Sequence, residues 1–120
     1  MRILLADDQL KVRFALRTLL ERQPGLEVVG EARSDADLRG QIEATGPDLI
    51  LLDWELPGER ALDTLSTLRI MYPDLRVIAL SGRSEARQAA LQAGVDAFVS
   101  KADPPERLLA AIDKTIPGQR

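Results

Sequence analysis

Leu49-Ile50-Leu51-Leu52-Asp53 is the stretch that decides the fold, because four consecutive apolar residues end abruptly at a carboxylate. A short apolar run of this kind is typical of a strand that is buried on both faces of a parallel sheet. Three further runs also end in a chemically special side chain: Ile3-Leu4-Leu5-Ala6 in Asp7-Asp8, Val77-Ile78-Ala79-Leu80 in Ser81, and Ala97-Phe98-Val99-Ser100 in Lys101. Because the carboxyl ends of parallel strands meet at one edge, we expect these polar groups to gather where open α/β folds place their chemistry.

Helical periodicity fills the segments between these runs. Apolar residues at helical spacing predict a first helix through the following positions: Val12, Ala15, Leu16, Leu19 and Leu20. Pro24-Gly25 ends that helix, and the alternation of Glu27 and Glu31 with apolar residues predicts a strand at the edge of the sheet. A single short helix joining two neighbouring strands makes those strands parallel.

Capping residues and prolines mark the later helices. Ser34 to Asp37 resembles a capping box, and the last helix is predicted to open at Asp103 as N-cap, with Pro104 at the first helical position, and to close before Pro117. The other predicted elements are helices at 34–46, 60–71 and 84–93 and strands at 48–52, 75–80 and 96–100. Together these elements predict an α/β fold with one doubly wound parallel sheet of five strands and five helices.

Composition limits both the architecture and the chemistry. With 120 residues, 45% of them apolar, the chain can bury one ordinary core, so we expect a single domain over 1–116 and a C-terminal linker or tail over 117–120. The absence of Cys and His excludes disulfides, thiolate or imidazole zinc sites, cysteine nucleophiles and a Ser-His-Asp triad. A net charge of -3 disfavours a nucleic-acid surface, and no apolar run is long enough to span a membrane, so we expect a cytoplasmic protein without a membrane partner.

Asp7, Asp8 and Asp53 form the first candidate site. Three carboxylates at neighbouring strand ends would repel one another, and a hard divalent cation such as Mg²⁺ or Ca²⁺ would relieve that repulsion. Lys101, the one cation predicted at the same edge, could pair with a carboxylate and neutralise phosphate charge. The alternatives are that Asp7 and Asp8 cap the following helix, that Asp53 is a turn residue, and that Lys101 is a solvated charge.

Ser81-Gly82 offers a hydroxyl beside a residue that lets the backbone approach a ligand closely. Its N–H and O–H groups could hold a phosphoryl oxygen, and the alternative is a plain turn into the next helix. Neither G-x-G-x-x-G nor G-x-x-x-x-G-K-[ST] occurs in the chain, which disfavours nucleotide binding by those routes.

Taken in order, these segments resemble the receiver domain of two-component response regulators over essentially the whole chain. The resemblance rests on Ile3-Leu4-Leu5-Ala6-Asp7-Asp8, Leu51-Leu52-Asp53-Trp54-Glu55-Leu56-Pro57-Gly58, Ala79-Leu80-Ser81-Gly82 and Ala93-Gly94-Val95-Asp96-Ala97-Phe98-Val99-Ser100-Lys101. Residues 24–32 are also similar to receivers that precede a LuxR-type DNA-binding output domain. The implied fold is the flavodoxin-like receiver type. Two positions depart from the family, since no second glycine closely follows Pro57-Gly58 and Ala102 replaces the common proline after Lys101.

The resemblance implies a phosphoacceptor and a metal site. Asp53 would accept a phosphoryl group from a phosphohistidine of a sensor histidine kinase or phosphotransfer protein, or from a small phosphodonor. Mg²⁺ would be bound by Asp8, Asp53 and the backbone carbonyl of Glu55, with Asp7 acting through a water molecule. This agrees with the chemistry of in-line phosphoryl displacement, which needs a positioned carboxylate, a metal ion and a cation on the phosphoryl oxygens.

The resemblance also implies a switch. Lys101 would contact the phosphoryl group, Ser81 would hydrogen-bond it, and Phe98 would be the aromatic switch residue. The surface formed by the helix at 84–93, the strand at 96–100 and the last helix would then change its packing. Four alanines are predicted to be the small buried residues of the first of these helices: Ala86, Ala89, Ala90 and Ala93. The alternatives are that Phe98 is an ordinary core aromatic and that the alanines only favour helix.

The implied function is that of a phospho-accepting signalling domain rather than an enzyme, controlling a transcriptional output. DNA would be contacted only through a C-terminal effector domain absent from this chain, and a homodimer would form through the switch surface or through the first and last helices. Glu55 and Arg83, beside the acceptor and the hydroxyl, could pair with or compete with incoming groups. One alternative is an interaction-only pseudo-receiver. A phosphohydrolase is disfavoured because Trp54-Glu55 places no second Asp two residues after Asp53.

Overall fold

The computed structural model describes residues 1–116, and residues 117–120, where the sequence predicts a linker or tail, lie outside the described part. Strands and helices alternate: β1 (Arg2–Ala6), α1 (Leu10–Glu21), β2 (Glu27–Ala32), α2 (Asp35–Thr45), β3 (Leu49–Asp53), α3 (Ala61–Met71), β4 (Arg76–Ser81), α4 (Ala86–Ala93), β5 (Ala97–Ser100) and α5 (Pro105–Thr115). The strands pair in parallel in the order β2-β1-β3-β4-β5. The predicted doubly wound sheet of five strands with five helices is confirmed.

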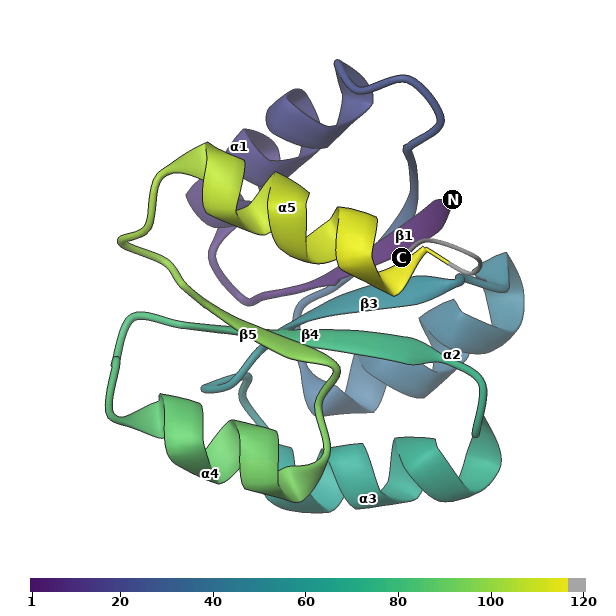
Figure 1. The fold of residues 1–120 in the computed structure, drawn as a ribbon. Helices are drawn as coiled ribbons and strands as arrows, with labels where there is room; N and C mark the ends of the chain where they lie inside the picture. The colour runs from purple at the N-terminus through teal and green to yellow at the C-terminus, as the bar shows by residue number, and fades with distance from the viewer. Residues whose placement is uncertain (117–120) are drawn as a thin grey trace.

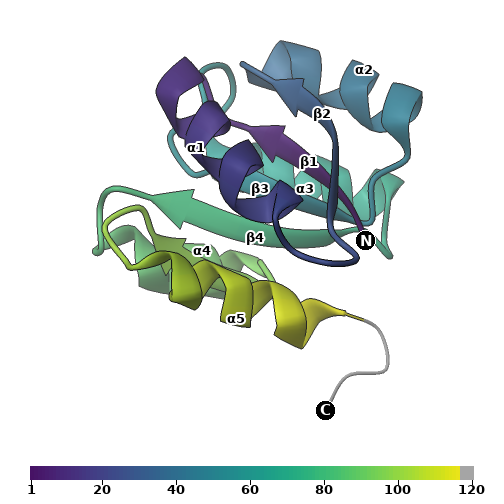
Figure 2. The ribbon, with the colours of Figure 1, turned by 90° about the horizontal axis from the view of Figure 1, so that it is seen from above.

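Helices cover both faces of the sheet, with α1 and α5 on one face and α2, α3 and α4 on the other (Figure 1). Figure 2 shows α1 and α5 in front of the strands when the molecule is seen from above. Alternate residues of β3 serve the two layers, since Ile50 and Leu52 pack toward α2–α4 while Leu49 and Leu51 pack toward α1 and α5. Each is at most 1% exposed, and burying such a side chain contributes about 1.5–3 kcal/mol.

β2 is an edge strand, as its alternating glutamates predict. Glu31 on this strand pairs with two arginines of α1, at 2.6 Å from Arg13 Nε and 2.7 Å from Arg17 Nη2. Burial would raise the pKa of the Glu31 carboxyl, but the contacts with Arg17 and Arg13 outweigh burial and hold the pKa below its ordinary value. Arg13 is only 7% exposed, so α1 is tied to the edge strand by a buried charge that the sequence does not predict.

The start of α4 differs from the prediction. The helix begins at Ala86 rather than at Ser84, because residues 84 and 85 form a turn. Ala86 and Ala90 are buried and Ala93 is half-buried, but Ala89, predicted to be buried, is exposed. Four alanines of equal size do not specify which side of a helix faces the core, so the prediction for Ala89 was wrong.

The start of α5 also differs. Its N-cap is Pro104 and its first helical residue is Pro105, so the prediction of Asp103 as N-cap was wrong. The carboxylate of Asp103 turns back instead and accepts the backbone N–H of Ser100 at 3.1 Å. With this bond the aspartate closes the turn that carries the chain out of β5. Among residues 1–116, no helix is both long enough and apolar enough to cross a membrane.

The loop after β3 is anchored on the start of α2. The backbone N–H of Asp35 donates to the carbonyl of Pro57 at 2.9 Å, and Thr64 of α3 donates to the Asp35 carboxylate at 2.8 Å. Gly58 adopts a φ of +120°, and a Cβ at this position would lie 2.6 Å from the Cβ of Asp35. Glycine is therefore required both by backbone conformation and by space, and the anchored loop fixes the chain that follows Asp53.

Replacing Ser34 by alanine is expected to cost about 1 kcal/mol of folding free energy. Ser34 is the N-cap of α2, and its hydroxyl accepts the N–H of Asp37 at 3.3 Å, so its loss leaves a helix donor without a partner. Urea unfolding measures the change. Ser66→Ala is the matched control, because Ser66 is exposed inside α3, where alanine is the better helix former. An equal loss in both variants would contradict the capping role.

Candidate functional site

Five polar side chains lie at the carboxyl edge of the sheet, because the strands that carry them are parallel. They come from four strand ends: Asp7 and Asp8 after β1, Asp53 on β3, Ser81 on β4 and Lys101 after β5. The register pairs Asp53 with Leu80 and Ser81 with Ser100, so the ends of β3, β4 and β5 lie nearly level. The residues that the sequence assigns to one site are thus brought to one place.

Asp7, Asp8 and Asp53 form an acidic cluster in which each carboxylate offers an oxygen within 4.8 Å of the others. Asp7 and Asp53 are 1% and 2% exposed, whereas Asp8 faces solvent. Burial, with the neighbouring charge of Asp7, raises the pKa of the Asp53 carboxyl above its ordinary value. The cluster therefore combines repulsion between like charges with the cost of burying two of them.

Lys101 bridges the two buried carboxylates. Its Nζ lies 2.8 Å from Asp7 Oδ2 and 3.3 Å from Asp53 Oδ1. Burial would lower the pKa of Lys101, but its contacts with Asp7 and Asp53 outweigh burial and leave the pKa above its ordinary value. The side chain of Lys101 is only 24% exposed, so it is not the solvated charge that the sequence left open.

The acidic cluster has the donor set of a magnesium site. Asp7 Oδ1 accepts the N–H of Gln9 at 2.9 Å, but Oδ2 has no aligned hydrogen-bond partner among residues 1–116 despite its ion pair with Lys101. All three ligand groups are carboxylates, and hard oxygen donors suit Mg²⁺. The alternative in which Asp7 or Asp8 caps the next helix is not observed, since Gln9 is the N-cap of α1.

Glu55 links the acceptor strand to Ser81. Its backbone N–H donates to Asp53 Oδ1 at 3.0 Å, which orients that carboxylate. The hydroxyl of Ser81, a fully buried residue, lies 2.9 Å from both carboxylate oxygens of Glu55. From the sequence, Glu55 is expected only to bind Mg²⁺ through its backbone carbonyl and to pair with or compete with incoming groups. This specific contact was missed, because only the sheet register places the two side chains together.

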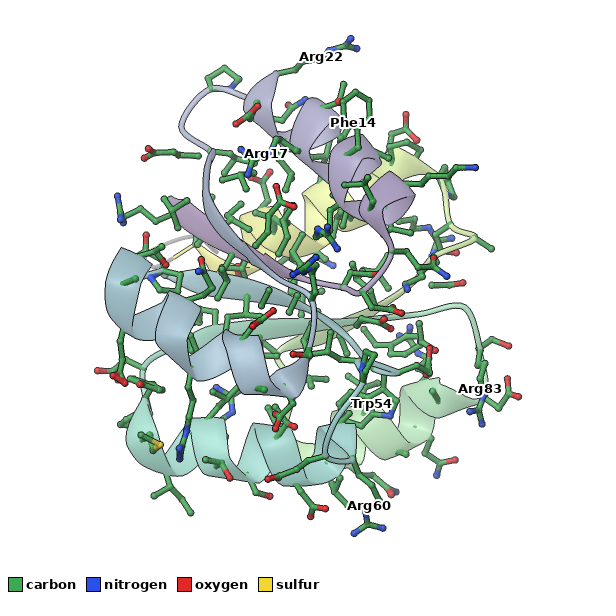
Figure 3. All side chains as sticks on the ribbon, turned by 180° about the vertical axis from the view of Figure 1, so that it is seen from behind. Phe14, Arg17, Arg22, Trp54, Arg60 and Arg83 are labelled. Carbon is green, nitrogen blue, oxygen red and sulfur yellow. The ribbon has the colours of Figure 1, made fainter. Side chains whose placement is uncertain are left out.

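Two aromatic residues flank the site. Trp54 follows Asp53 directly and packs, half-buried, against the core cluster on the side of the sheet that carries α3 and α4 (Figure 3). Phe98 on β5 is 8% exposed, and the guanidinium carbon of Arg87 from α4 lies 5.9 Å from its ring centroid. Phe98 therefore joins β5 to α4 in the core cluster and through this cation–π contact.

Arg13 is a site residue that the sequence reasoning missed. Its Nη1 donates to the backbone carbonyl of Asp7 at 2.7 Å, while its Nε holds Glu31. The guanidinium thereby braces the loop that carries Asp7 and Asp8. Arg13 and Arg17 stand one helical turn apart on α1 and both contact Glu31 of β2, but two arginines at this spacing give no signal in the sequence that one of them is buried.

The family model for the response regulator receiver domain matches residues 3–113. The chain belongs to this family. Two curated relatives of the receiver domain are the transcriptional regulatory protein YhcZ of Bacillus subtilis and the nitrate/nitrite response regulator protein NarL of Escherichia coli K12. YhcZ is 36% identical over 91% of this chain and 52% of its own length. NarL is 35% identical over 98% of this chain and 55% of its own length. The chain thus spans about half the length of these relatives.

A solved structure supports the same assignment for the receiver domain. The two-component response regulator of the LuxR family from Aurantimonas sp. SI85-9A1 superposes with a TM-score of 0.88, at 31% identity, over 99% of this chain and 86% of that one. The receiver domain is therefore that of a LuxR-family two-component response regulator, the subfamily that the sequence resembles.

Proposed function

We propose that residues 1–116 form a phospho-accepting receiver domain in which Asp53 takes a phosphoryl group from a histidine kinase or phosphotransfer protein. The observation that carries this proposal is the placement of Lys101 Nζ between the buried carboxylates of Asp7 and Asp53, at 2.8 and 3.3 Å. A buried carboxylate held beside a fixed cation is poised to receive a phosphoryl group, because catalysis of this transfer is mostly positioning and charge stabilisation.

In the proposed step, a carboxylate oxygen of Asp53 attacks the phosphorus of the donor phosphohistidine. The new phosphorus–oxygen bond gives an acyl phosphate, and the phosphorus–nitrogen bond breaks with its electron pair leaving on the imidazole, which departs as the neutral ring because the second ring nitrogen of the donor carries a proton. Lys101 lies where it can take charge from the transferred oxygens, and Ser81 supplies a hydroxyl at the same edge. The site acts once on its own side chain, so we propose a signalling role rather than that of an enzyme.

Four groups would hold Mg²⁺ in this proposal. They are the carboxylates of Asp8 and Asp53, the backbone carbonyl of Glu55 and, through a water molecule, Asp7. The clustering of the three carboxylates and the unaligned Oδ2 of Asp7 support this assignment. Bound Mg²⁺ supplies positive charge that offsets the negative charge of the phosphoryl oxygens.

The proposed readout is a change in the surface of α4, β5 and α5. Phosphorylation adds about -1.5 to -2 charge next to Ser81 and Lys101, and Phe98 connects β5 to α4. Only two residues of α4, Ala86 and Ala90, are buried, so little apolar area holds this helix in place.

The proposed partners follow from the relatives. YhcZ is a transcriptional regulatory protein, so we propose that a C-terminal effector domain outside this chain contacts DNA. We also propose a homodimer. The exposed apolar residues of α1 favour the surface of this helix as the contact between the two copies. Leu10 and Phe14 of α1 are 70% and 69% exposed. Phe14 is labelled on this helix in Figure 3, and a cavity of about 360 Å³ lies between α1 and α5.

Mass spectrometry after incubation with acetyl phosphate and Mg²⁺ tests the proposal. We expect one phosphoryl group on the wild-type protein and none on Asp53→Ala. Asp48→Ala is the matched control, because Asp48 is an exposed aspartate at the opposite end of β3, and it should be labelled like the wild type. An unlabelled wild type would favour an interaction-only pseudo-receiver, whereas an undiminished adduct in Asp53→Ala would place the phosphoryl group on another residue; either outcome would defeat the proposal.

A further inference from the structure

The hydroxyl of Ser81 already has an anionic acceptor. Its Oγ lies 2.9 Å from both Oε1 and Oε2 of Glu55, and it accepts the backbone N–H of Arg83 at 3.0 Å. A serine hydroxyl has a single proton to donate. Ser81 can therefore donate fully to Glu55 or to a phosphoryl oxygen, but not to both.

We propose that Glu55 competes with the phosphoryl group for the Ser81 proton and thereby weakens the affinity of the site for that group. This inference rests on the proposed function, in which Ser81 donates to the phosphoryl group on Asp53. Glu55 acts through Ser81 and is a positioning residue. In the unmodified protein its carboxylate holds the hydroxyl, and on phosphorylation it must release the hydroxyl and turn away.

The charge of Glu55 strengthens this competition. No basic side chain within residues 1–116 forms an ion pair with it, and the nearby Arg83 instead lies 3.8 Å from Glu85. A phosphoryl group brings about -1.5 to -2 charge, so the two anions repel as well as compete. Glu55 is exposed, which gives its carboxylate room to move into solvent and allows its replacement without disturbing the core.

Beryllofluoride with Mg²⁺, titrated against the fluorescence of Trp54, measures the competition. Trp54 is the one tryptophan of the chain and adjoins Asp53. We expect Glu55→Ala to bind beryllofluoride about fivefold more tightly than the wild type. Glu55→Gln should lie between the two, because its amide oxygen still accepts the proton but without a charge. Glu59→Ala, which removes another exposed carboxylate from the same loop, should match the wild type.

A double-mutant cycle with Ser81→Ala separates the proposed route from a purely electrostatic one. If Glu55 acts through the Ser81 hydroxyl, the gain from Glu55→Ala should fall to less than about twofold when Ser81 is alanine. A fivefold gain that persists without the hydroxyl would overturn the inference, as would unchanged or weaker binding by Glu55→Ala.

The unmodified protein provides a second readout. Because the N–H of Arg83 donates to Ser81 Oγ, its amide resonance should shift in Glu55→Ala and not in Glu59→Ala, and an unmoved resonance would contradict the contact. The two proposals fail separately. A wild type that takes no phosphoryl group or beryllofluoride at Asp53 defeats both, whereas normal labelling of Asp53 with no effect of Glu55→Ala defeats only the role of Glu55.

Discussion

Replacing Lys101 by methionine is expected to lower the free energy of unfolding by about 3 kcal/mol when Mg²⁺ is absent. The ammonium group lies 2.8 Å from Asp7 Oδ2 and 3.3 Å from Asp53 Oδ1, and both aspartates are almost fully buried. Methionine fills a similar volume but leaves two buried carboxylates without their counter-charge. Urea unfolding in EDTA measures the loss, and adding Mg²⁺ should restore part of it, because the metal replaces the missing positive charge.

The same substitution should slow phosphoryl transfer from acetyl phosphate to Asp53 by about a hundredfold, since removal of one preorganised charge-stabilising group typically costs this much. Transfer is measured without urea, with saturating Mg²⁺, and at a temperature at which the variant is folded. Lys114→Met is the matched control, because Lys114 is exposed near the end of α5, and it should lose at most about 0.5 kcal/mol. If Lys101→Met unfolded like this control in EDTA, the bridging ion pair would contribute nothing to stability.

The gathering of the acidic residues could be predicted because it depends on topology alone. Leu49-Ile50-Leu51-Leu52 forms a strand covered on both faces, and any residue that ends such a strand must lie at the carboxyl edge. The positions of Asp53 and Ser81 therefore follow from sequence pattern and parallel connection. These two positions can be predicted without knowledge of any side-chain conformation.

Features that depend on the rotation of a helix or the direction of a side chain could not be predicted. Ala86 and Ala89 are chemically identical, so no periodicity indicates which of them is buried. Either Pro104 or Pro105 could have taken the first helical position, and the outcome depended on Asp103 bonding back to Ser100. Each of these outcomes depends on tertiary contacts that outweigh the local preference.

Buried polar contacts are a second kind of feature that the sequence does not predict. Arg13 is charged and lies on a surface helix, which predicts exposure, yet Glu31 and the carbonyl of Asp7 compensate its burial. The contact of Ser81 with Glu55 likewise requires two strands to be in register. A charge becomes buried when partners from other elements satisfy it, and the sequence pattern of α1 alone does not contain those partners.

Replacing Asp8 by asparagine is expected to weaken Mg²⁺ binding by at least about tenfold while leaving the fold intact. Asp8 is exposed, so its loss removes no core contact, and in EDTA it should slightly raise the free energy of unfolding by relieving the repulsion among the three clustered carboxylates. A Mg²⁺ titration followed by Trp54 fluorescence measures the affinity, and urea unfolding in EDTA measures the stability.

Asp113→Asn is the matched control for this prediction, because Asp113 is an exposed aspartate of α5 outside the acidic cluster. Asp113→Asn removes one negative charge, as Asp8→Asn does, and should bind Mg²⁺ like the wild type. A difference in Mg²⁺ affinity between the two variants therefore reports where the charge was removed and not the change in net charge. Equal Mg²⁺ affinity in Asp8→Asn and Asp113→Asn would remove Asp8 from the ligand set. A loss of stability in EDTA for Asp8→Asn would instead mean that its carboxylate supports the fold, because relief of repulsion predicts the opposite sign.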